Sequence, residues 1–570
     1  MARHLPHVLA VLLAAAALGY GFTGYPLLEP DEGRNAEVAR EMAAGNDYVL
    51  PRLNGLPYID KPVLYFAAGA VVMELLGPTE LAARLPSLVF TLLTLVVLVW
   101  FARRRIGPEG AWIAGIAGAA APFTIAYART VIFDSALTLW VVVAIIAFYE
   151  AVEAEVAPAT AQPPNRPPAG GRGWGWAVLA WIAIGLGLLT KGPVALVLPL
   201  LVALPYAGWR RRWRAVLEPL GLLAMLAIVL PWTFAVSRAV PGFLQYVLVV
   251  ETAQRLATDA LGRTEAWWYF APILLGAALP WSVVALAGTV RALRRRPLAF
   301  DPRAVWLGLW VIVPLVFFSL SQSKRPQYIL PLVPPLALSV ALLWQGAARR
   351  TPGARTAAAV LLLLGAVLVA GATRLPELVR ASAEVRAATP GAARMLGAVA
   401  VAAGAFTWAL CARQAWVLAA LALPAAAIPI AGGSLLSAIG ADRSSRALAQ
   451  AVAPWLEPHT EVVAVGTFPL SLPFYLRRPL TVATADAREL TSNYIARHQA
   501  ELRRVPGSPL RPAEWWEEAL ALCGRPRLFV VPVEAAAARA RLEEAVPLRA
   551  TARKVAVYGP CGAAGYAYSP

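Results

Sequence analysis

The sequence places ionisable side chains at the ends of long apolar runs, where such residues are costly. The chain has 570 residues, of which 59% are hydrophobic and only 15% are charged. An ionised side chain costs about 2.5–3.5 kcal/mol at the centre of a membrane-spanning helix and less near its ends. Ionisable residues at these boundaries are therefore the first candidates for binding or catalysis. The acidic candidates are Asp31, Glu32, Asp60 and Asp134, and the basic ones are Arg34, Lys61, Lys191, Arg255 and Lys324.

Two of the aspartates begin predicted helices. Asp31 follows Pro30 and precedes a helix-like stretch over 33–44, and Asp134 begins the apolar run FDSALTLW. Aspartate at such a position commonly caps the helix by accepting backbone N–H bonds. A carboxylate at the end of a helix can also face a substrate pocket. The sequence leaves both roles open for both residues.

Lysine is used so rarely that its positions are informative. The chain has four lysines against 47 arginines, and three of the four lie in DKP, TKGP and SKRP, as Lys61, Lys191 and Lys324. A compact ammonium group with three donors suits a phosphate or a close carboxylate. The alternative, a lysine that extends along apolar surface to reach the membrane boundary, stays open for all three.

Motifs for nucleotides and metals are missing from the sequence. It contains no G-x-x-x-x-G-K-[ST], and no G-x-G-x-x-G opens a helix after a strand. The four histidines are scattered, and no two of the three cysteines have the spacing of metal ligands. We therefore expect no nucleotide-binding fold, and the sequence leaves a metal requirement unknown.

Apolar runs recur from residue 8 to about residue 432 and predict a polytopic membrane protein. The first run is predicted to be a retained signal anchor, with a cleaved signal peptide as the alternative. The run Val63–Gly77 contains Glu74 and is short, so it predicts a helix at the outer interface. Thirteen spans are predicted, at about 8–28, 87–102, 110–127, 133–150, 175–189, 193–208, 216–235, 271–290, 304–320, 328–346, 356–373, 395–411 and 415–432.

Arginine clusters predict the orientation of these spans. With thirteen spans, the clusters fall on one side, which the positive-inside rule makes cytoplasmic. They account for most of the net charge of +18, so the charge does not indicate a nucleic-acid partner. The Pro/Gly-rich stretch 157–173 is a predicted cytoplasmic linker. The clusters are Arg103–Arg105, Arg210–Arg214, Arg291–Arg296, Arg349–Arg355 and Arg413.

The last part of the chain has a different composition and predicts a small α/β domain. We divide the chain into a membrane domain, residues 1–433, with a first exported loop at 29–86, and a soluble exported domain, residues 434–570. The soluble part contains Cys523 and Cys561, which are either a disulfide or two free thiols. Predicted strands are 461–466, 528–533 and 554–558, and predicted helices are 485–504 and 512–523.

The sequence resembles the polyprenyl-phosphate-dependent glycosyltransferases related to the aminoarabinose transferase of lipid A. These enzymes belong to the protein O-mannosyltransferase superfamily and have the GT-C fold. The resemblance covers residues 8–346 or so, with motifs in order and at family-like spacing. The motifs are PDEGR and NAEVAREM from Pro30, GNDYVLPRLNGLPYIDKPVLYF from Gly45, RLPS from Arg84, FDSALTLW from Phe133, TKGP from Thr190, ETAQR from Glu251 and SKRPQYILPLVPPLAL from Ser323.

The resemblance implies a multi-pass enzyme of the bacterial inner membrane whose active site faces the periplasm. It would be an inverting glycosyltransferase that moves a sugar from undecaprenyl phosphate to lipid A or another envelope glycolipid. The family's catalytic acids correspond to Asp31 and Asp134. The residues that would bind the donor phosphate are Lys61, Arg34, Arg255 and Tyr328, and Glu32, Asp60, Lys191 and Lys324 are further pocket candidates.

One departure from the family concerns Asp60. The family more usually has Glu-Lys-Pro-Pro where this chain has Asp60-Lys61-Pro62-Val63. The shorter acidic arm leaves a metal or acceptor contact by this residue open.

Other functions remain as alternatives. The acceptor could be a protein, as in the O-glycosyltransferases of the same superfamily. A polytopic lipid or sugar transporter would also contain many spans, but transporters often show internal repeats and charges near the centre of the membrane. A third alternative is a non-catalytic envelope assembly protein, which would leave Asp31, Lys61 and Asp134 without a role.

Overall fold

The computed structural model divides into two compact units. It describes the chain except for residues 1–4, 157–172, 248–264, 296–300, 346–350, 379, 553 and 562–570. Arg255 and residues 157–172 of the predicted linker lie outside the described residues. The helical unit comprises residues 1–22, 84–238 and 248–436, and the mixed unit comprises residues 23–83, 239–247 and 437–570.

This division differs from the predicted one in its treatment of the first loop. The helical unit ends at residue 436, close to the predicted domain boundary after residue 433. The loop over 29–86, which we assigned to the membrane domain, instead falls mostly in one unit with the C-terminal residues. One physical reason is Asn54, whose side-chain amide donates to Leu480 O at 2.7 Å and whose Oδ1 accepts from Leu480 N–H at 2.7 Å.

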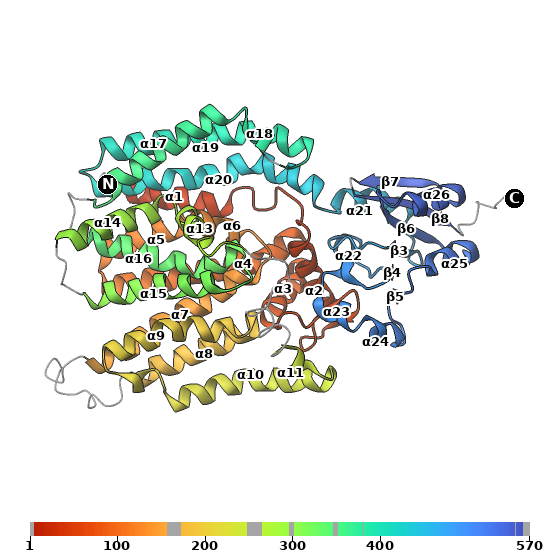
Figure 1. Cartoon of the computed structure of the whole chain (residues 1–570), viewed down its shortest axis with the longest axis horizontal. Coiled ribbons are helices and arrows are strands. Elements are labelled where there is room, and N and C mark those ends of the chain that lie inside the picture. Colours follow the sequence, from red (N-terminus) through yellow and green to blue (C-terminus); the bar gives the residue numbers. More distant parts are fainter. Residues whose placement is uncertain are drawn as a thin grey trace. The chain divides into compact units, whose positions relative to one another are not determined.

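The helical unit is built almost entirely from α-helices (Figure 1). Its core consists of large aromatic and small aliphatic side chains, and α17 and α19 lie side by side. The helices are α1 (Leu5–Gly19), α4 (Glu80–Arg105), α5 (Pro108–Ala119), α6 (Pro122–Ala128), α7 (Phe133–Val156), α8 (Trp174–Lys191), α9 (Val194–Trp209), α10 (Pro219–Ala239), α13 (Phe270–Ala277), α14 (Trp281–Arg295), α15 (Pro302–Leu320), α16 (Val333–Trp344), α17 (Ala354–Gly371), α18 (Leu375–Leu378), α19 (Ala383–Ala409) and α20 (Gln414–Asp442), with 3₁₀ helices at Trp213–Ala215 and Pro326–Leu332.

Each of the thirteen predicted spans overlaps helical residues, but the predicted span 8–28 extends beyond α1, which ends at Gly19. Within the described part of the chain, nine helices are long and apolar enough to cross a membrane, and two bent pairs raise the number to eleven. Of the two remaining predicted spans, α1 has 15 residues and α9 has 16. The chain is therefore a multi-pass membrane protein, and the count of thirteen stays a prediction.

Two spans that we predicted as single helices are broken. The helices α5 and α6 meet at 61°, and α13 and α14 meet at 107°. Pro122 begins α6, and Pro280 directly precedes α14. Proline has no N–H to donate to the preceding turn, so each proline ends the helix before it.

Burial separates the central helix from the outer ones. In α7, 89% of the most apolar 18-residue stretch is buried inside the protein. The corresponding stretch of Trp213–Ala239 is only 11% buried. A helix that is apolar all round must be surrounded by protein or by lipid. The helix α7, which begins with Phe133 and Asp134, is therefore central to the helical unit.

The mixed unit contains a six-stranded sheet of order β5-β4-β3-β6-β8-β7. The first four strands in this order are parallel, and β8 pairs antiparallel with both β6 and β7. The strands are β3 (Glu461–Val465), β4 (Thr481–Ala483), β5 (Leu510–Arg511), β6 (Arg527–Pro532), β7 (Leu548–Ala552) and β8 (Val555–Cys561). The three predicted strands correspond to β3, β6 and β8.

Short helices and a hairpin complete the mixed unit. The predicted helix over 485–504 is wrong as a single element, because Thr491 has φ 53° and Ser492 Oγ accepts the N–H of Ile495, which starts a new helix. The elements are α2 (Asp31–Gly45), β1 (Arg52–Leu53), β2 (Leu56–Pro57), α3 (Leu64–Leu76), α11 (Phe243–Gln245), α21 (Arg446–Val452), α22 (Leu472–Leu476), α23 (Asn493–Arg497), α24 (Gln499–Arg504), α25 (Trp515–Leu522) and α26 (Ala536–Ala545), with 3₁₀ helices at Ala453–Trp455 and Arg488–Leu490.

The two cysteines of the tail form a disulfide. Cys523 directly follows α25, Cys561 ends β8, and their Cα atoms are 5.9 Å apart. Of the two alternatives that the sequence left open, the structure has the bonded one. Cys411 is the free cysteine of the described residues.

Candidate active site

Asp31 is the first residue of α2, and its carboxylate pairs with a side chain on the same helix. The residue before the helix is Pro30, so Asp31 is not the N-cap. Asp31 Oδ1 accepts from Arg34 Nη2 at 2.5 Å, and the exposed fractions of the two side chains are 33% and 14%. This spacing of three residues places both side chains on one face of the helix.

Two further residues of the mixed unit, Thr491 and Tyr58, contact Arg34. Its Nη1 donates to Thr491 Oγ1 at 2.8 Å, and its guanidinium lies 6.0 Å from the ring centroid of Tyr58. Burial alone would lower the pKa of Arg34, but neighbouring Tyr58 and Asp31 outweigh burial and raise the pKa above its usual value. The guanidinium is thus a permanent and well-positioned cation. Tyr58 is not among the predicted site residues, although it lies two residues before Asp60 in the motif that begins at Gly45.

Glu32, a predicted pocket residue, has a local backbone contact. Its side chain is only 2% exposed, and Oε2 accepts the N–H of Leu28 at 2.9 Å. This bond ties the chain before α2 to the first turn of the helix.

The Asp60 carboxylate joins three chain segments of the mixed unit. It accepts the hydroxyl of Tyr246 and the backbone N–H groups of Asn493 at 3.0 Å and Tyr494 at 3.1 Å. Asp60 is 9% exposed, and the Nζ of Lys61 donates to Asp60 O at 2.6 Å. The carboxylate therefore fixes the backbone that carries Lys61. Tyr246 gave no signal in the sequence, because it is far from Asp60 along the chain.

Asp134 and Lys191 form a buried ion pair in the helical unit. Asp134 lies in the first turn of α7 and is 2% exposed, while Lys191 is the last residue of α8. Lys191 Nζ lies 2.5 Å from Asp134 Oδ1 and 5.1 Å from the ring centroid of Tyr328. Each charge has the sign that the dipole of its helix favours. Gly192, with φ +83°, ends α8 directly after the lysine.

Lys324 differs from the other two motif lysines. It is 8% exposed, and its Nζ donates to Ser321 O at 2.6 Å, directly after the end of α15. This bond satisfies a carbonyl at the end of a helix. The SKRP lysine thus stabilises the turn that leads to Tyr328.

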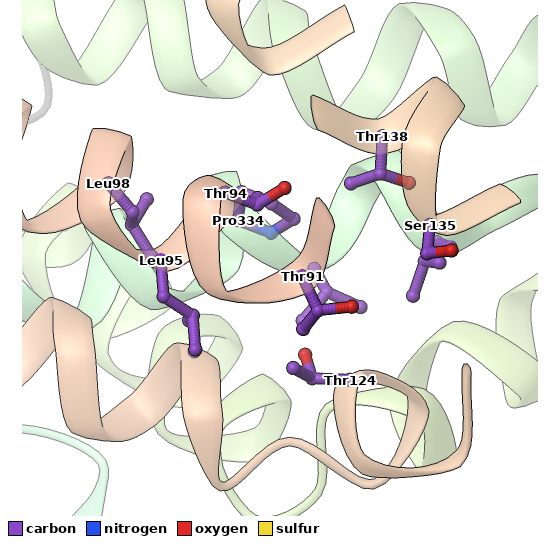
Figure 2. A pocket seen from close by; sticks show the side chains of 11 residues that line it. Thr91, Thr94, Leu95, Leu98, Thr124, Ser135, Thr138 and Pro334 are labelled. Carbon is purple, nitrogen blue, oxygen red and sulfur yellow. The ribbon is translucent and has the colours of Figure 1, made fainter. Parts of the chain in front are cut away.

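A small cavity, lined by apolar residues and by five side chains with hydroxyl groups, lies beside the start of α7 (Figure 2). Its volume is about 30 Å³, which is room for a water molecule. Thr138 Oγ1 donates to Asp134 O at 2.7 Å, and Thr91 Oγ1 donates to Ser87 O at 2.8 Å, so both oxygens keep lone pairs for a further donor. The hydroxyl groups of the lining belong to Thr91, Thr94, Thr124, Ser135 and Thr138.

The arginine-rich ends of the helices lie at the opposite end of α7 from Asp134. Glu150 accepts bonds from Arg104 and Arg105, and Glu153 accepts bonds from Arg210. Glu150 follows Asp134 by 16 residues, which is about 24 Å along a helix. The Asp134–Lys191 pair and the arginine clusters therefore face opposite sides of the helical unit.

The described residues thus contain two groups of predicted site residues, one in each unit. No three His, Cys, Asp or Glu side chains come together to hold a metal ion in the part of the chain that the structure describes. The mixed unit holds Asp31, Glu32, Arg34, Asp60 and Lys61, and the helical unit holds Asp134, Lys191, Lys324 and Tyr328.

Known proteins match the chain over different lengths. Residues 72–247 match the family described as dolichyl-phosphate-mannose-protein mannosyltransferase. The undecaprenyl phosphate-alpha-4-amino-4-deoxy-L-arabinose arabinosyl transferase of Edwardsiella ictaluri is 33% identical over 321 residues, covering 56% of this chain and 55% of that protein. Its counterpart in Pseudomonas aeruginosa strain UCBPP-PA14 is 34% identical over 335 residues, covering 58% of each chain. The chain thus spans little more than half the length of these curated relatives.

A solved structure extends the likeness to nearly the whole chain. The crystal structure of ArnT from Cupriavidus metallidurans bound to undecaprenyl phosphate superposes with a TM-score of 0.81 and 27% identity, covering 99% of both chains. The apo form superposes with a TM-score of 0.78 and 28% identity, covering 98% of both. The chain is therefore a helical membrane protein that is similar to ArnT over nearly its whole length.

Proposed function

We propose that the chain is an inverting glycosyltransferase that moves a sugar from a polyprenyl phosphate to an envelope acceptor, with undecaprenyl phosphate as the donor lipid. The observation that carries this proposal is the likeness to ArnT bound to undecaprenyl phosphate, which covers 99% of both chains. A lipid-linked donor also fits the chemistry of the location, because nucleotide sugars are not available outside the cytoplasmic membrane. The acceptor that we favour is lipid A or another envelope glycolipid.

The proposed reaction breaks the bond between the sugar C1 and the phosphate oxygen. Positive charge develops on the sugar ring and negative charge on the departing phosphate. We assign stabilisation of the phosphate to Arg34, Lys61 and Arg255, with a hydrogen bond from Tyr328. The described geometry supports both residues, because Arg34 pairs with the carboxylate of Asp31 and the Nζ of Lys61 donates to the backbone O of Asp60.

Asp31 is assigned to the acceptor. Its pairing with Arg34 holds the carboxylate in one orientation, which suits the positioning of an acceptor oxygen. An acceptor that is already an anionic phosphate needs little proton removal, whereas a hydroxyl acceptor needs a base, which contributes typically 10²–10⁴-fold in rate. Asp134, paired with Lys191, is assigned to the same reaction as the second acid.

We further propose that the reaction takes place on the periplasmic side of the bacterial inner membrane, with the C-terminal α/β residues also exported. Two observations support this orientation. The arginine-rich ends lie opposite Asp134 along α7, and arginine accumulates on the cytoplasmic side. The Cys523–Cys561 disulfide suits an oxidising compartment.

The test of the proposed activity is transfer of label from a radiolabelled polyprenyl-phosphate sugar by the purified chain. Asp31→Asn and Lys61→Ala should each reduce turnover by about 10²–10⁴-fold. The matched controls are Asp486→Asn and Lys554→Ala, which change the same residue types in the C-terminal part and should retain activity. Near-normal turnover by both site variants would remove the roles assigned to Asp31 and Lys61. Label that crosses the membrane of vesicles without leaving the lipid would indicate a transporter.

The acceptor needs a separate experiment. Mass spectrometry of envelope lipids and glycoproteins from a strain that lacks the gene reports the missing modification without presuming its carrier. Loss of a sugar from a glycolipid would support the favoured acceptor. Loss from a protein would instead assign the chain to the O-glycosyltransferases of proteins.

A further inference from the structure

A groove in the helical unit is lined by none of the residues assigned so far. It runs along α14, with contributions from α13 and α17, and encloses about 450 Å³, within the roughly 300–1,000 Å³ of small-molecule sites. Its floor is apolar and its charged side chains are arginines, so a matching ligand has an apolar body and an anionic head. The lining residues are Leu275, Val283, Leu286, Ala287, Val290, Arg291, Arg294 and Thr356.

The spacing along α14 gives the groove a length and a direction. Val283, Ala287, Val290 and Arg294 follow one another at three or four residues, so they share one face of the helix. Eleven residues separate Val283 from Arg294, which is about 16 Å. The hydrocarbon core of a bilayer is about 30 Å thick, so the groove matches one leaflet, with its arginines at head-group level.

Contacts within the helical unit place these arginines at the arginine-rich end. A side chain at Gly288 would lie 3.4 Å from Pro352 O, which also accepts from Trp344 Nε1 at 3.1 Å. The next residue, Gln345, donates to Ile106 O at 2.9 Å, directly after Arg105. The groove therefore opens on the leaflet at the opposite end of the unit from Asp134.

We propose that this groove binds an anionic glycerophospholipid, with an acyl chain along α14 and the head-group phosphate on Arg291 and Arg294. The argument is charge complementarity, because both arginines are exposed at the mouth of an apolar groove one leaflet long. The exposed hydroxyl of Thr356 supplies a hydrogen-bond donor at the same mouth. In the orientation proposed above, this is a lipid of the cytoplasmic leaflet, and its binding does not depend on the transferase activity.

The test is native mass spectrometry of the full chain in mild detergent, titrated separately with phosphatidylglycerol and phosphatidylcholine. The wild type should bind phosphatidylglycerol more tightly. Each near-surface arginine contributes about fivefold in affinity, so Arg291→Gln with Arg294→Gln should weaken phosphatidylglycerol binding about thirtyfold and leave phosphatidylcholine binding unchanged. The control is Arg212→Gln with Arg214→Gln, two exposed arginines outside the groove, which should leave both affinities unchanged.

A second variant addresses the apolar floor. Ala287→Phe fills the groove, so it should weaken the binding of both lipids and keep the preference for phosphatidylglycerol. Equal binding of the two lipids by the wild type would overturn the proposal, and so would an equal loss in the control variant. Transferase assays on the same samples separate the two proposals, because the groove variants should retain turnover.

Discussion

At the scale of single residues, the Asp134–Lys191 ion pair stabilises the fold because each charge compensates the other. Asp134 is 2% exposed, and removing one member of a buried pair leaves the other charge uncompensated at a cost of about 3–5 kcal/mol. Lys191→Met should therefore lower the thermal unfolding midpoint clearly. The double variant Asp134→Asn with Lys191→Met should recover part of the loss, because no charge is left unpaired.

Lys554→Ala is the reference for this comparison, because Lys554 is exposed and belongs to the mixed unit, whereas the ion pair belongs to the helical unit. The test is thermal unfolding in one detergent, followed by tryptophan fluorescence, of the wild type, Lys191→Met, the double variant and Lys554→Ala. A Lys191→Met midpoint equal to that of the reference would show that the pair does not stabilise the fold.

Glu37 is a second buried acid, on α2 and outside the predicted spans. Burial raises the pKa of Glu37 to about 8, against hydrogen bonds from Arg40 at 2.7 Å. Because the folded-state pKa lies above the ordinary value of 4.5, the stabilising contribution of Glu37 is complete below about pH 4.5. It is lost as the pH rises through about 8.

We therefore expect the unfolding midpoint to fall over this pH interval, and to fall less in Glu37→Gln, which cannot ionise. Midpoints measured in steps from pH 5 to pH 9 test this, with exposed Glu518→Gln as the control. An identical pH profile for Glu37→Gln and the wild type would contradict the prediction.

At the scale of elements, α2 packs against the C-terminal residues of the mixed unit through Gly33. A Cβ atom at this position would lie 2.8 Å from both Ser471 N and Ser471 Cβ, whereas a Cβ at Gly45 on the same helix would meet nothing within 4 Å. Gly33→Ala should therefore cost about 1–3 kcal/mol through overpacking. Gly45→Ala should be neutral or stabilising, because alanine favours helices.

The unfolding midpoints of the two alanine variants, measured side by side, test this packing. A Gly33→Ala protein as stable as Gly45→Ala would mean that α2 does not pack this closely on Ser471.

The bend between α13 and α14 is a feature that the apolar pattern of the sequence does not reveal. An apolar run predicts a span by composition, and each of the thirteen predicted runs overlaps helical residues in the described part of the structure. Apolar composition says little about direction, so the 107° bend between α13 and α14 was not predicted. Pro280 was visible in the sequence, but prolines also lie inside continuous helices, such as Pro199 and Pro205 of α9.

At the scale of the whole molecule, the cysteines provide a test of the proposed orientation. In whole cells, a membrane-impermeant maleimide should label Cys523 and Cys561 only after treatment with an impermeant reductant, because the two form a disulfide. Cys411, at the arginine-rich end beside Arg355, should be labelled only after the inner membrane is opened. Labelling of the tail cysteines only after that step would contradict the exported location.

The contacts of the first loop could not be predicted from the sequence. We assigned residues 29–86 to the membrane domain, as its first exported loop. In the structure, Asn54 binds Leu480, and Glu29 accepts bonds from Ser445 and Ser471. These partners lie more than 400 residues away along the chain, and no local pattern specifies such a pairing.

The sequence by itself determined that this chain crosses the membrane many times. It also singled out the rare lysines, and the aspartates at the ends of apolar runs, as candidate site residues. Both conclusions follow because hydrophobicity and the cost of a charge in lipid act locally. Only the tertiary structure decided what each of these groups contacts. It paired Asp134 with Lys191, turned Lys324 to the backbone and gave Asp60 three donors from distant segments. Such partners follow from how elements pack in space, and spacing along the chain does not encode that packing.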